Sequence, residues 1–208
     1  NRPMIEELVK TIGRHRNGDI NIPTLTRSNT VYLAIVDKDR NVASIANSLF
    51  HSFGSGICPP ETGVLFQNRG VSFNLKDDHP NQFGPAKRPM HTVMPGMVGL
   101  NDEVTLAYGV MGGDYQPLGH AHLLTAILNY GLEIQEACNL PRYMPADNGS
   151  EIEPSFSIET KEKLSDYGHN VLWSKDPIGG AQVIGIDLKN GILKGASDPR
   201  KDGFAAGL

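Results

Sequence analysis

The order of strand and helix patterns in this sequence predicts an α+β fold, in which antiparallel sheets are covered by helices. Two apolar strand patterns joined by a turn come early, helix patterns lie in the middle, and further strand patterns follow near the C-terminus. A doubly wound parallel sheet would need strands and helices in regular alternation, and this order does not provide it. At 208 residues, the chain fits a single domain of this kind.

The N-terminal part of the chain is predicted to form a helix, a linker and a β-hairpin. Residues 4–12 carry apolar side chains at helical spacing. Residues 17–29 are polar and include glycine, proline and serine, which indicates an exposed linker. The chain then turns apolar, and residues 31–36 and 42–49 each predict a strand, with turn residues at 37–41 between them.

The rest of the chain predicts further strands around a central helix. A third strand is expected at 63–67, followed by a polar loop at 72–88. Pro117 suits the first position of a helix and Gly131 the position just past its end, which predicts a helix over 117–130. The remaining strands are expected at 91–98, 103–110, 170–174, 181–188 and 192–197, and shorter helices near 133–138 and 157–167.

The composition argues against two classes of partner. The net charge is −4, and the 19 Lys and Arg residues are scattered, so no basic patch points to nucleic acid or to an anionic membrane. No apolar run approaches the roughly 20 residues of a membrane span. The compartment stays open between the cytoplasm and the periplasm or extracellular space.

Thr30 stands at the border between the polar linker and the apolar strand. If the Asn29–Thr30 bond were cut, Thr30 would present a hydroxyl nucleophile beside its own α-amine. An α-amine has an ordinary pKa of about 7.7–8.0, so it can act as a general base near neutral pH. The hydroxyl of Ser48, on the adjacent strand, can orient Thr30. Since threonine is also common at the start of a strand, a purely structural role stays open on these features alone.

Gly112 and Gly113 lie just ahead of the predicted central helix. Paired glycines let the backbone approach a ligand closely, and successive N–H groups near a helix N-terminus stabilise negative charge. An oxyanion hole uses this arrangement. A tight turn from strand to helix is the alternative interpretation.

Neither the histidines nor the cysteines predict a metal site. His120 and His122 are two residues apart on a predicted helix, so they do not share a face. Cys58 and Cys138 are too few for a cluster. We expect two free thiols, and a single disulfide between them is the alternative. No cofactor is expected.

Several segments, in order from Thr30 almost to the C-terminus, resemble the small subunit of γ-glutamyltransferases, also called γ-glutamyltranspeptidases or glutathione hydrolases. They are Thr30-Val-Tyr-Leu-Ala-Ile-Val-Asp-Lys-Asp39, Phe53-Gly-Ser-Gly56, Gly63-Val-Leu-Phe-Gln-Asn68, Lys87-Arg-Pro89, Gly112-Gly113, Asn139-Leu-Pro-Arg142 and Gly195-Ala-Ser-Asp-Pro-Arg200. The resemblance implies an αββα sandwich of the N-terminal-nucleophile (Ntn) hydrolase type, matured by autocatalytic cleavage before the nucleophilic threonine. It also implies transfer of γ-glutamyl groups from glutathione and related amides to amino acids, dipeptides or water.

The resemblance assigns roles to individual residues and to two parts of the chain. Thr30 would be the nucleophile, Ser48 a supporting hydroxyl that is usually threonine, and Gly112 and Gly113 the oxyanion hole. Residues 1–29 would be the tail of the large subunit, and residues 30–208 the catalytic small-subunit domain. The large subunit of the same precursor would then be the partner, supplying part of the sandwich and an arginine that grips the substrate carboxylate.

Several expected substrate-binding positions depart from members that bind the glutamyl α-amine. His91 and Thr92 stand where such members carry a neutral serine pair. Phe50 or His51 lies near a position at which they use asparagine. These departures predict a changed acyl pocket.

The departure at Ser72 changes the charge of the expected pocket. Ser72 stands where those members carry an acid, so the ion pair to a substrate ammonium group is lost, and the nearby Arg69 would favour an anion instead. We therefore expect a glutaryl group or another acyl group that bears a carboxylate. A glutaryl- or cephalosporin-acylase-like amidase is the alternative enzyme, and an uncleaved, noncatalytic partner of a heterodimer is the alternative from another class.

Overall fold

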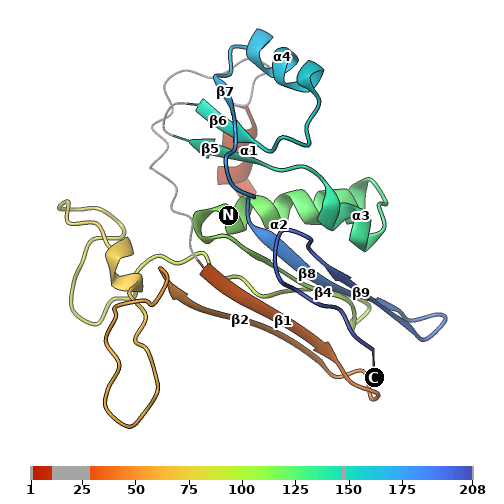
Figure 1. Cartoon of the computed structure of the whole chain (residues 1–208), viewed down its shortest axis with the longest axis horizontal. Helices are drawn as coiled ribbons and strands as arrows, with labels where there is room; N and C mark the ends of the chain where they lie inside the picture. The colour runs from red at the N-terminus through yellow and green to blue at the C-terminus, as the bar shows by residue number, and fades with distance from the viewer. Residues whose placement is uncertain (1, 11–28, 147–148, 208) are drawn as a thin grey trace. The chain divides into compact units, whose positions relative to one another are not determined.

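A computed structural model describes residues 2–10, 29–146 and 149–207 (Figure 1). Its contacts divide the chain into two compact units, one made of Asn1–Leu25 and Pro141–Ile178, the other of Thr26–Leu140 and Gly179–Leu208. The predicted linker at 17–29 lies outside the described residues, apart from Asn29. The predicted boundary between residues 1–29 and 30–208 is a cleavage site and not a boundary between compact units. It stays a prediction.

The predicted hairpin is present and opens the second unit. β1 (Asn29–Val36) pairs antiparallel with β2 (Val42–Phe50), with Thr30 opposite Ser48 and a register irregularity between Asn29 and Thr30. The turn between the strands is held by Asp37, whose carboxylate accepts hydrogen bonds from Asn41 and from the Asp39 backbone N–H. These bonds lower the pKa of Asp37. The strand-turn-strand pattern of the hairpin is local, which explains why the sequence predicts the hairpin well.

A four-stranded antiparallel sheet packs against one face of this hairpin. Its strands are β3 (Gly96–Leu100), β4 (Glu103–Met111), β8 (Gly180–Asp187) and β9 (Ile192–Ser197), in the order β3-β4-β8-β9. The ring of Tyr32 on β1 lies against Gly109 on β4, where even a Cβ atom would come within 2.2 Å of it. The core of this unit therefore lies between the two sheets and under the helices.

Helices cover the other face of the four-stranded sheet (Figure 1). A short 3₁₀ turn, Gly113–Tyr115, leads into α2 (Gln116–Leu124), which continues as a π-helical turn at Thr125–Asn129. Next comes α3 (Ile134–Asn139), whose contacts reach β8 and β9, whereas α2 contacts β4. Two antiparallel sheets with a helical layer confirm the predicted α+β class. Gly131 has a φ of 68°, as expected for a residue that ends a helix.

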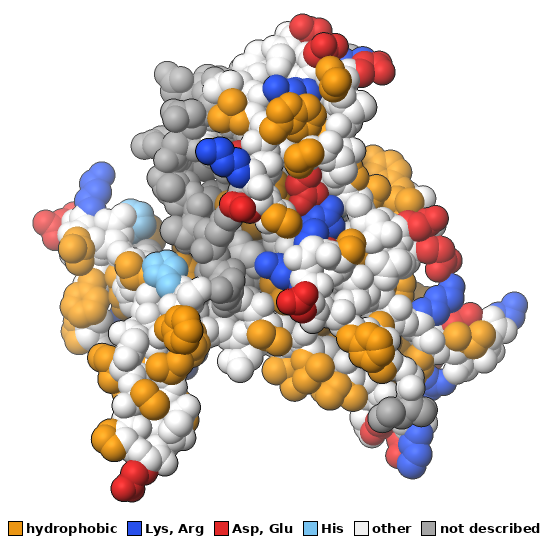
Figure 2. Space-filling model, viewed as in Figure 1, with side chains coloured by type: hydrophobic (Ala, Val, Ile, Leu, Met, Phe, Trp, Pro, Cys, Tyr) orange, Lys and Arg blue, Asp and Glu red, His pale blue; other side chains and the backbone are white. Residues whose placement is uncertain are grey.

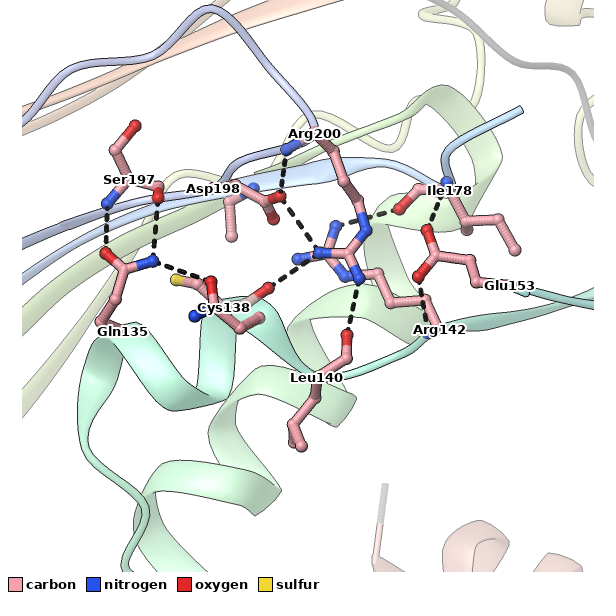
Figure 3. Close-up of polar contacts among 11 residues, drawn as sticks. Gln135, Cys138, Leu140, Arg142, Glu153, Ile178, Ser197, Asp198 and Arg200 are labelled. Atoms are coloured by element: carbon pink, nitrogen blue, oxygen red, sulfur yellow. Dashed lines mark hydrogen bonds and ion pairs between the residues drawn. The ribbon is translucent and has the colours of Figure 1, made fainter. Parts of the chain in front are cut away.

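A cluster of polar contacts joins α3 to the end of β9 and to the segment that follows it (Figure 3). The guanidinium of Arg200 donates to the carbonyl oxygens of Cys138 and Leu140 at 2.9 and 2.8 Å and pairs with Asp198 at 3.1 Å. Gln135 adds a second link by donating to the Ser197 carbonyl oxygen at 3.0 Å. Arg200 thus serves the last carbonyl groups of α3, which have no partner within the helix.

The first unit holds the remaining elements. They are α1 (Arg2–Lys10), β5 (Tyr143–Ala146), β6 (Gly149–Ile152), α4 (Ile158–Asp166) and β7 (Val171–Trp173). Its three-stranded sheet has the order β5-β6-β7, with β6 and β7 parallel. Glu153 joins two ends of the unit, since its carboxylate accepts from the backbone N–H groups of Arg142 and Ile178 at 3.0 and 2.9 Å.

Two sequence-based predictions of strands need correction, and two short strands were missed. Residues 63–67 form no strand, because Phe66 pairs with Ser55 and Ile57 inside a looped segment and finds no ladder to join. Residues 91–95 also lie outside any strand, so β3 begins only at Gly96. β5 and β6 were not predicted, because they are four residues each and proline and glycine obscure their pattern.

Candidate active site

The hydroxyl groups of Thr30 and Ser48 lie together at one end of the hairpin. The antiparallel register places them opposite each other, and Thr30 Oγ1 donates to Ser48 Oγ at 3.2 Å. The backbone N–H of Phe50 also donates to Ser48 Oγ, at 3.0 Å. Ser48 is thus fixed by its own strand while it accepts from Thr30. Its role as a supporting hydroxyl stays a prediction.

A third polar side chain, which the sequence reasoning missed, reaches Thr30 from the helical layer. The side-chain amide of Gln116, the first residue of α2, lies 3.5 Å from Thr30 Oγ1. Gln116 is only 1% exposed. Its nitrogen can donate to the carbonyl oxygens of Thr92 at 2.7 Å and Val110 at 3.2 Å. The sequence shows a glutamine directly before Pro117, at the predicted start of the helix. The residue type alone does not show which part of the fold that side chain contacts.

Gly112 and Gly113 form the turn between β4 and the helical layer. Both have positive φ angles, 133° and 61°. A Cβ on Gly112 would lie 2.8 Å from the Cα of Gly179, so the two backbones approach each other closely. As the cap and first residue of a helical turn, both carry N–H groups that have no acceptor within that turn. Gly113 lies three residues before Gln116, the residue whose side chain reaches Thr30. A role of the two glycines as an oxyanion hole stays a prediction.

Arg69 lies beside the start of β1. Its guanidinium carbon is 5.0 Å from the centre of the Phe50 ring, and Phe50 is opposite Asn29 in the strand register. Partial burial lowers the pKa of Arg69, but a guanidinium remains protonated in proteins. In the part of the chain that the structure describes, no acidic side chain forms an ion pair with Arg69. The result is a half-buried cation on the ring of Phe50, the residue opposite Asn29 in the hairpin.

His51 also stacks on the Phe50 ring. The two rings stack with centroids 4.6 Å apart. Asn68 donates to His51 Nδ1 at 2.8 Å and accepts from the His51 backbone N–H at 3.1 Å. Because Nδ1 accepts a hydrogen bond, the imidazole carries its proton on Nε2.

The other predicted substrate-binding residues are less closely tied to Thr30. Thr92 is buried and linked to the site through its carbonyl oxygen and Gln116, and its own hydroxyl finds no partner among the described residues. His91 is exposed. Ser72 is half-buried, and its carbonyl oxygen accepts from Asn81 at 2.6 Å. Across the described residues, no hydrogen bond joins His91 or Ser72 to Thr30.

His120 is a buried residue of α2 that contacts the first turn of the same helix. Its Nδ1 lies 2.7 Å from the carbonyl oxygen of Gln116, and its ring meets that of Tyr108 edge to face. Burial raises the pKa of Tyr108.

Within the described residues, no group of three or more His, Cys, Asp and Glu side chains could hold a metal ion. No described helix is long and apolar enough to cross a membrane.

Comparison with solved structures identifies the fold. The chain aligns with the cephalosporin acylase from Bacillus halodurans with a TM-score of 0.86 and 35% sequence identity, over 99% of this chain and 38% of that one. Two packed antiparallel sheets with a helical layer, and a threonine at the start of the first strand, define the class: an N-terminal-nucleophile hydrolase fold.

Comparison with known sequences identifies the family. The sequence profile described as gamma-glutamyltranspeptidase matches residues 4–208, and the chain belongs to this family. It is 38% identical over 203 residues to the glutathione hydrolase-like YwrD proenzyme of Bacillus subtilis, covering 92% of this chain and 38% of that protein. It is 36% identical over 187 residues to the oxamate amidohydrolase proenzyme of Klebsiella pneumoniae, covering 86% of this chain and 35% of that protein. The chain therefore spans little more than a third of the length of these relatives.

Proposed function

We propose that this chain is the catalytic part of a γ-glutamyltransferase-like amidohydrolase or acyltransferase, with Thr30 as the nucleophile once the Asn29–Thr30 bond is cut. The observation that carries the proposal is the position of Thr30. Its hydroxyl lies at the start of β1, 3.2 Å from Ser48 Oγ and beside the buried amide of Gln116. A hydroxyl held in this way, next to a newly freed α-amine, has both the orientation and the base that an N-terminal nucleophile needs.

The chemistry follows from these groups in two steps. Thr30 Oγ attacks the carbonyl carbon of an amide while the α-amine of Thr30 takes the hydroxyl proton. The N–H groups of Gly112 and Gly113 stabilise the oxyanion, and the proton passes to the leaving amine as the C–N bond breaks. Water or the amine of an amino acid or peptide then attacks the ester and regenerates the Thr30 hydroxyl.

The partner in this proposal is the large subunit of the same precursor. Both relatives described above are named as proenzymes, and this chain corresponds to only part of their length. Residues 1–29 would end the large subunit and residues 30–208 would form the small one. The mature enzyme would then be a heterodimer of the two cleavage products.

Arg69 favours a particular class of acyl donor. It is a half-buried cation beside the start of β1, whereas Ser72 offers no negative charge to an ammonium group. A carboxylate on the acyl group would relieve the partial desolvation of Arg69 by forming charge-assisted hydrogen bonds. The oxamate amidohydrolase relative acts, by its name, on an amide whose acyl group bears a carboxylate. We therefore favour a glutaryl-like or shorter carboxylate-bearing acyl group over the γ-glutamyl group.

The proposed nucleophile is tested on the full precursor by substitution and mass analysis. Wild-type precursor should split into two chains, the smaller beginning at Thr30, and an electrophilic glutamine analogue should label that threonine. Thr30→Ala should remain uncut and inactive, whereas Thr26→Ala, which removes a hydroxyl four residues earlier, should process normally. A correctly assembled Thr30→Ala protein that still cleaved itself and turned over amides would refute the proposal.

A further inference from the structure

Gln116 is a buried carboxamide that meets three other parts of its unit. It begins α2, contacts the carbonyl groups of Thr92 and of Val110 on β4, and reaches Thr30 on β1. A buried polar side chain is costly unless its groups are hydrogen-bonded. An apolar side chain of the same size would fill the same space. The presence of a carboxamide at this buried position therefore needs a further explanation.

The two ends of this carboxamide can be assigned from their neighbours. Two carbonyl oxygens, those of Thr92 and Val110, lie 2.7 and 3.2 Å from the same end of the amide. An amide oxygen there would face two acceptors without a proton between them, whereas an amide nitrogen can donate to both. The nitrogen therefore faces the carbonyl groups, and the amide oxygen faces Thr30 Oγ1 at 3.5 Å.

We propose that Gln116 is a positioning residue for the nucleophile, acting through the hydroxyl of Thr30. This inference rests on the proposed function of Thr30. The two bonds to its nitrogen fix Gln116, so its oxygen is a fixed acceptor for the Thr30 hydroxyl. In this structure the Thr30 hydroxyl donates its hydrogen bond to Ser48 Oγ. When the Thr30 hydroxyl rotates toward Gln116, the Ser48 hydroxyl can donate to the Thr30 oxygen, so the nucleophile keeps both partners.

Fixing the Thr30 oxygen in this way affects both reactions that need it. The same oxygen attacks the Asn29 carbonyl during precursor cleavage and the substrate carbonyl during turnover. Loss of alignment by about 1 Å can cost roughly 100-fold in rate without changing the residues that carry the chemistry. Gln116 should therefore act on the rate constant kcat and on precursor cleavage, with little effect on substrate binding.

Two substitutions separate positioning from packing. Gln116→Met keeps the length of the side chain and removes both hydrogen-bonding ends. Gln116→Glu keeps the shape but places a carboxylate oxygen against the carbonyl groups of Thr92 and Val110, which repel it until the carboxyl group is protonated. Asn101→Asp, at an exposed position in the turn between β3 and β4, makes the same change of charge with no described contact to Thr30 and serves as the control.

The experiment measures precursor cleavage, kcat, KM and the thermal unfolding midpoint with the full precursor and an acyl anilide substrate. Gln116→Met should lower kcat and the cleavage rate roughly 100-fold, with KM within about threefold of wild type. For Gln116→Glu, the ratio of its kcat to the wild-type kcat should rise as the pH falls, because the protonated carboxyl group can donate where the carboxylate cannot. Asn101→Asp should match the wild-type kcat at every pH.

The outcomes also separate this inference from the proposed function. Wild-type kcat and cleavage in a folded Gln116→Met protein would overturn the role of Gln116, even if Thr30→Ala is inactive. If Gln116→Met does not fold, a pH-independent kcat ratio for Gln116→Glu would overturn that role just as directly. Turnover by Thr30→Ala in the same assay would instead refute the nucleophile itself.

Discussion

Arg69 gives the sharpest residue-scale prediction about the acyl donor. We expect wild-type enzyme to prefer a glutaryl anilide to a γ-glutamyl anilide, because the extra ammonium group of the glutamyl compound finds no acid at Ser72. Arg69→Met should reduce kcat/KM for the glutaryl compound by about 10- to 100-fold, the range for losing a hydrogen bond to a charged group. Steady-state kinetics with both anilides measures this preference.

Lys76→Met is a suitable control for this prediction, since it removes the same charge from an exposed position. It should leave both substrates unaffected. A wide preference of the wild-type enzyme for the γ-glutamyl compound would show that the acyl pocket has kept its amine specificity. An equal loss on both compounds in Arg69→Met would point to a structural role for Arg69.

Gly112 is predicted to be irreplaceable because of its backbone. Its φ of 133° is unfavourable for any other residue, and an added Cβ would collide with the Gly179 backbone. Gly112→Ala should therefore shift the oxyanion N–H groups and lower kcat about 100-fold or more. Gly131→Ala is the matched control, because Gly131 also has a positive φ but a Cβ there meets nothing within 4 Å.

The control glycine should affect stability only. Gly131→Ala should cost about 1–2 kcal/mol in the free energy of unfolding, since the left-handed conformation is strained for alanine. Its kcat should stay at the wild-type value. Near-normal kcat in Gly112→Ala would argue that the oxyanion is bound elsewhere.

At the scale of elements, a buried ion pair contributes to the attachment of α3 to the segment after β9. The Asp198 side chain has no exposed surface and that of Arg200 is 10% exposed. Arg200→Ala removes the cation beside Asp198 and the donors to the Cys138 and Leu140 carbonyl groups. Breaking a buried pair on one side costs about 3–5 kcal/mol, so we expect a loss near 3 kcal/mol in denaturant unfolding, since Asp198 keeps its backbone donors.

An exposed arginine provides the comparison for this element. Arg40 also donates to a carbonyl group, that of Gly191, but it lies at the surface. Arg40→Ala should change the free energy of unfolding by no more than about 0.5 kcal/mol. Equal effects of the two substitutions would show that α3 is held mainly by its apolar contacts.

At the scale of the whole molecule, one face of the hairpin is an apolar surface that is exposed among the residues the structure describes. Val31, Leu33 and Ile35 alternate with inward-facing residues and are 69%, 49% and 49% exposed. Ile45 on the paired strand adds to the same set of exposed apolar side chains. Figure 2 shows further hydrophobic side chains at the surface. Phe53 and Leu75, on the segment between β2 and β3, are also exposed. Surfaces of this kind mark contacts with another chain.

We expect the large-subunit part of the precursor to cover this face. Residues 30–208 made alone should bind a hydrophobic dye and self-associate, and co-expression with the large-subunit part should abolish both effects. Leu33→Glu should weaken that assembly, whereas Ile158→Glu, at an exposed position on α4, should not. Size-exclusion chromatography and dye fluorescence measure the outcome, and a monodisperse, dye-free isolated chain would contradict the prediction.

Local patterns made much of this protein readable from its sequence. The hairpin, the helix that begins after Gly113 and the last two strands each repeat a short period or carry their own start and stop signals, so no distant residue is needed to recognise them. Thr30, Ser48 and the paired glycines became candidates because their motifs occur in a fixed order along the chain. The strand register then places Thr30 opposite Ser48.

Only the tertiary structure decided which distant groups meet. Gln116 is 86 residues from Thr30 in sequence, and nothing in its neighbourhood predicts that a sheet-to-sheet packing will bring them together. Residues 63–67 look like a strand but lack a neighbouring strand to complete their hydrogen bonds, so they loop back on themselves. Sequence patterns report which face of an element is buried. The partner that buries it is chosen by the packing of the whole chain.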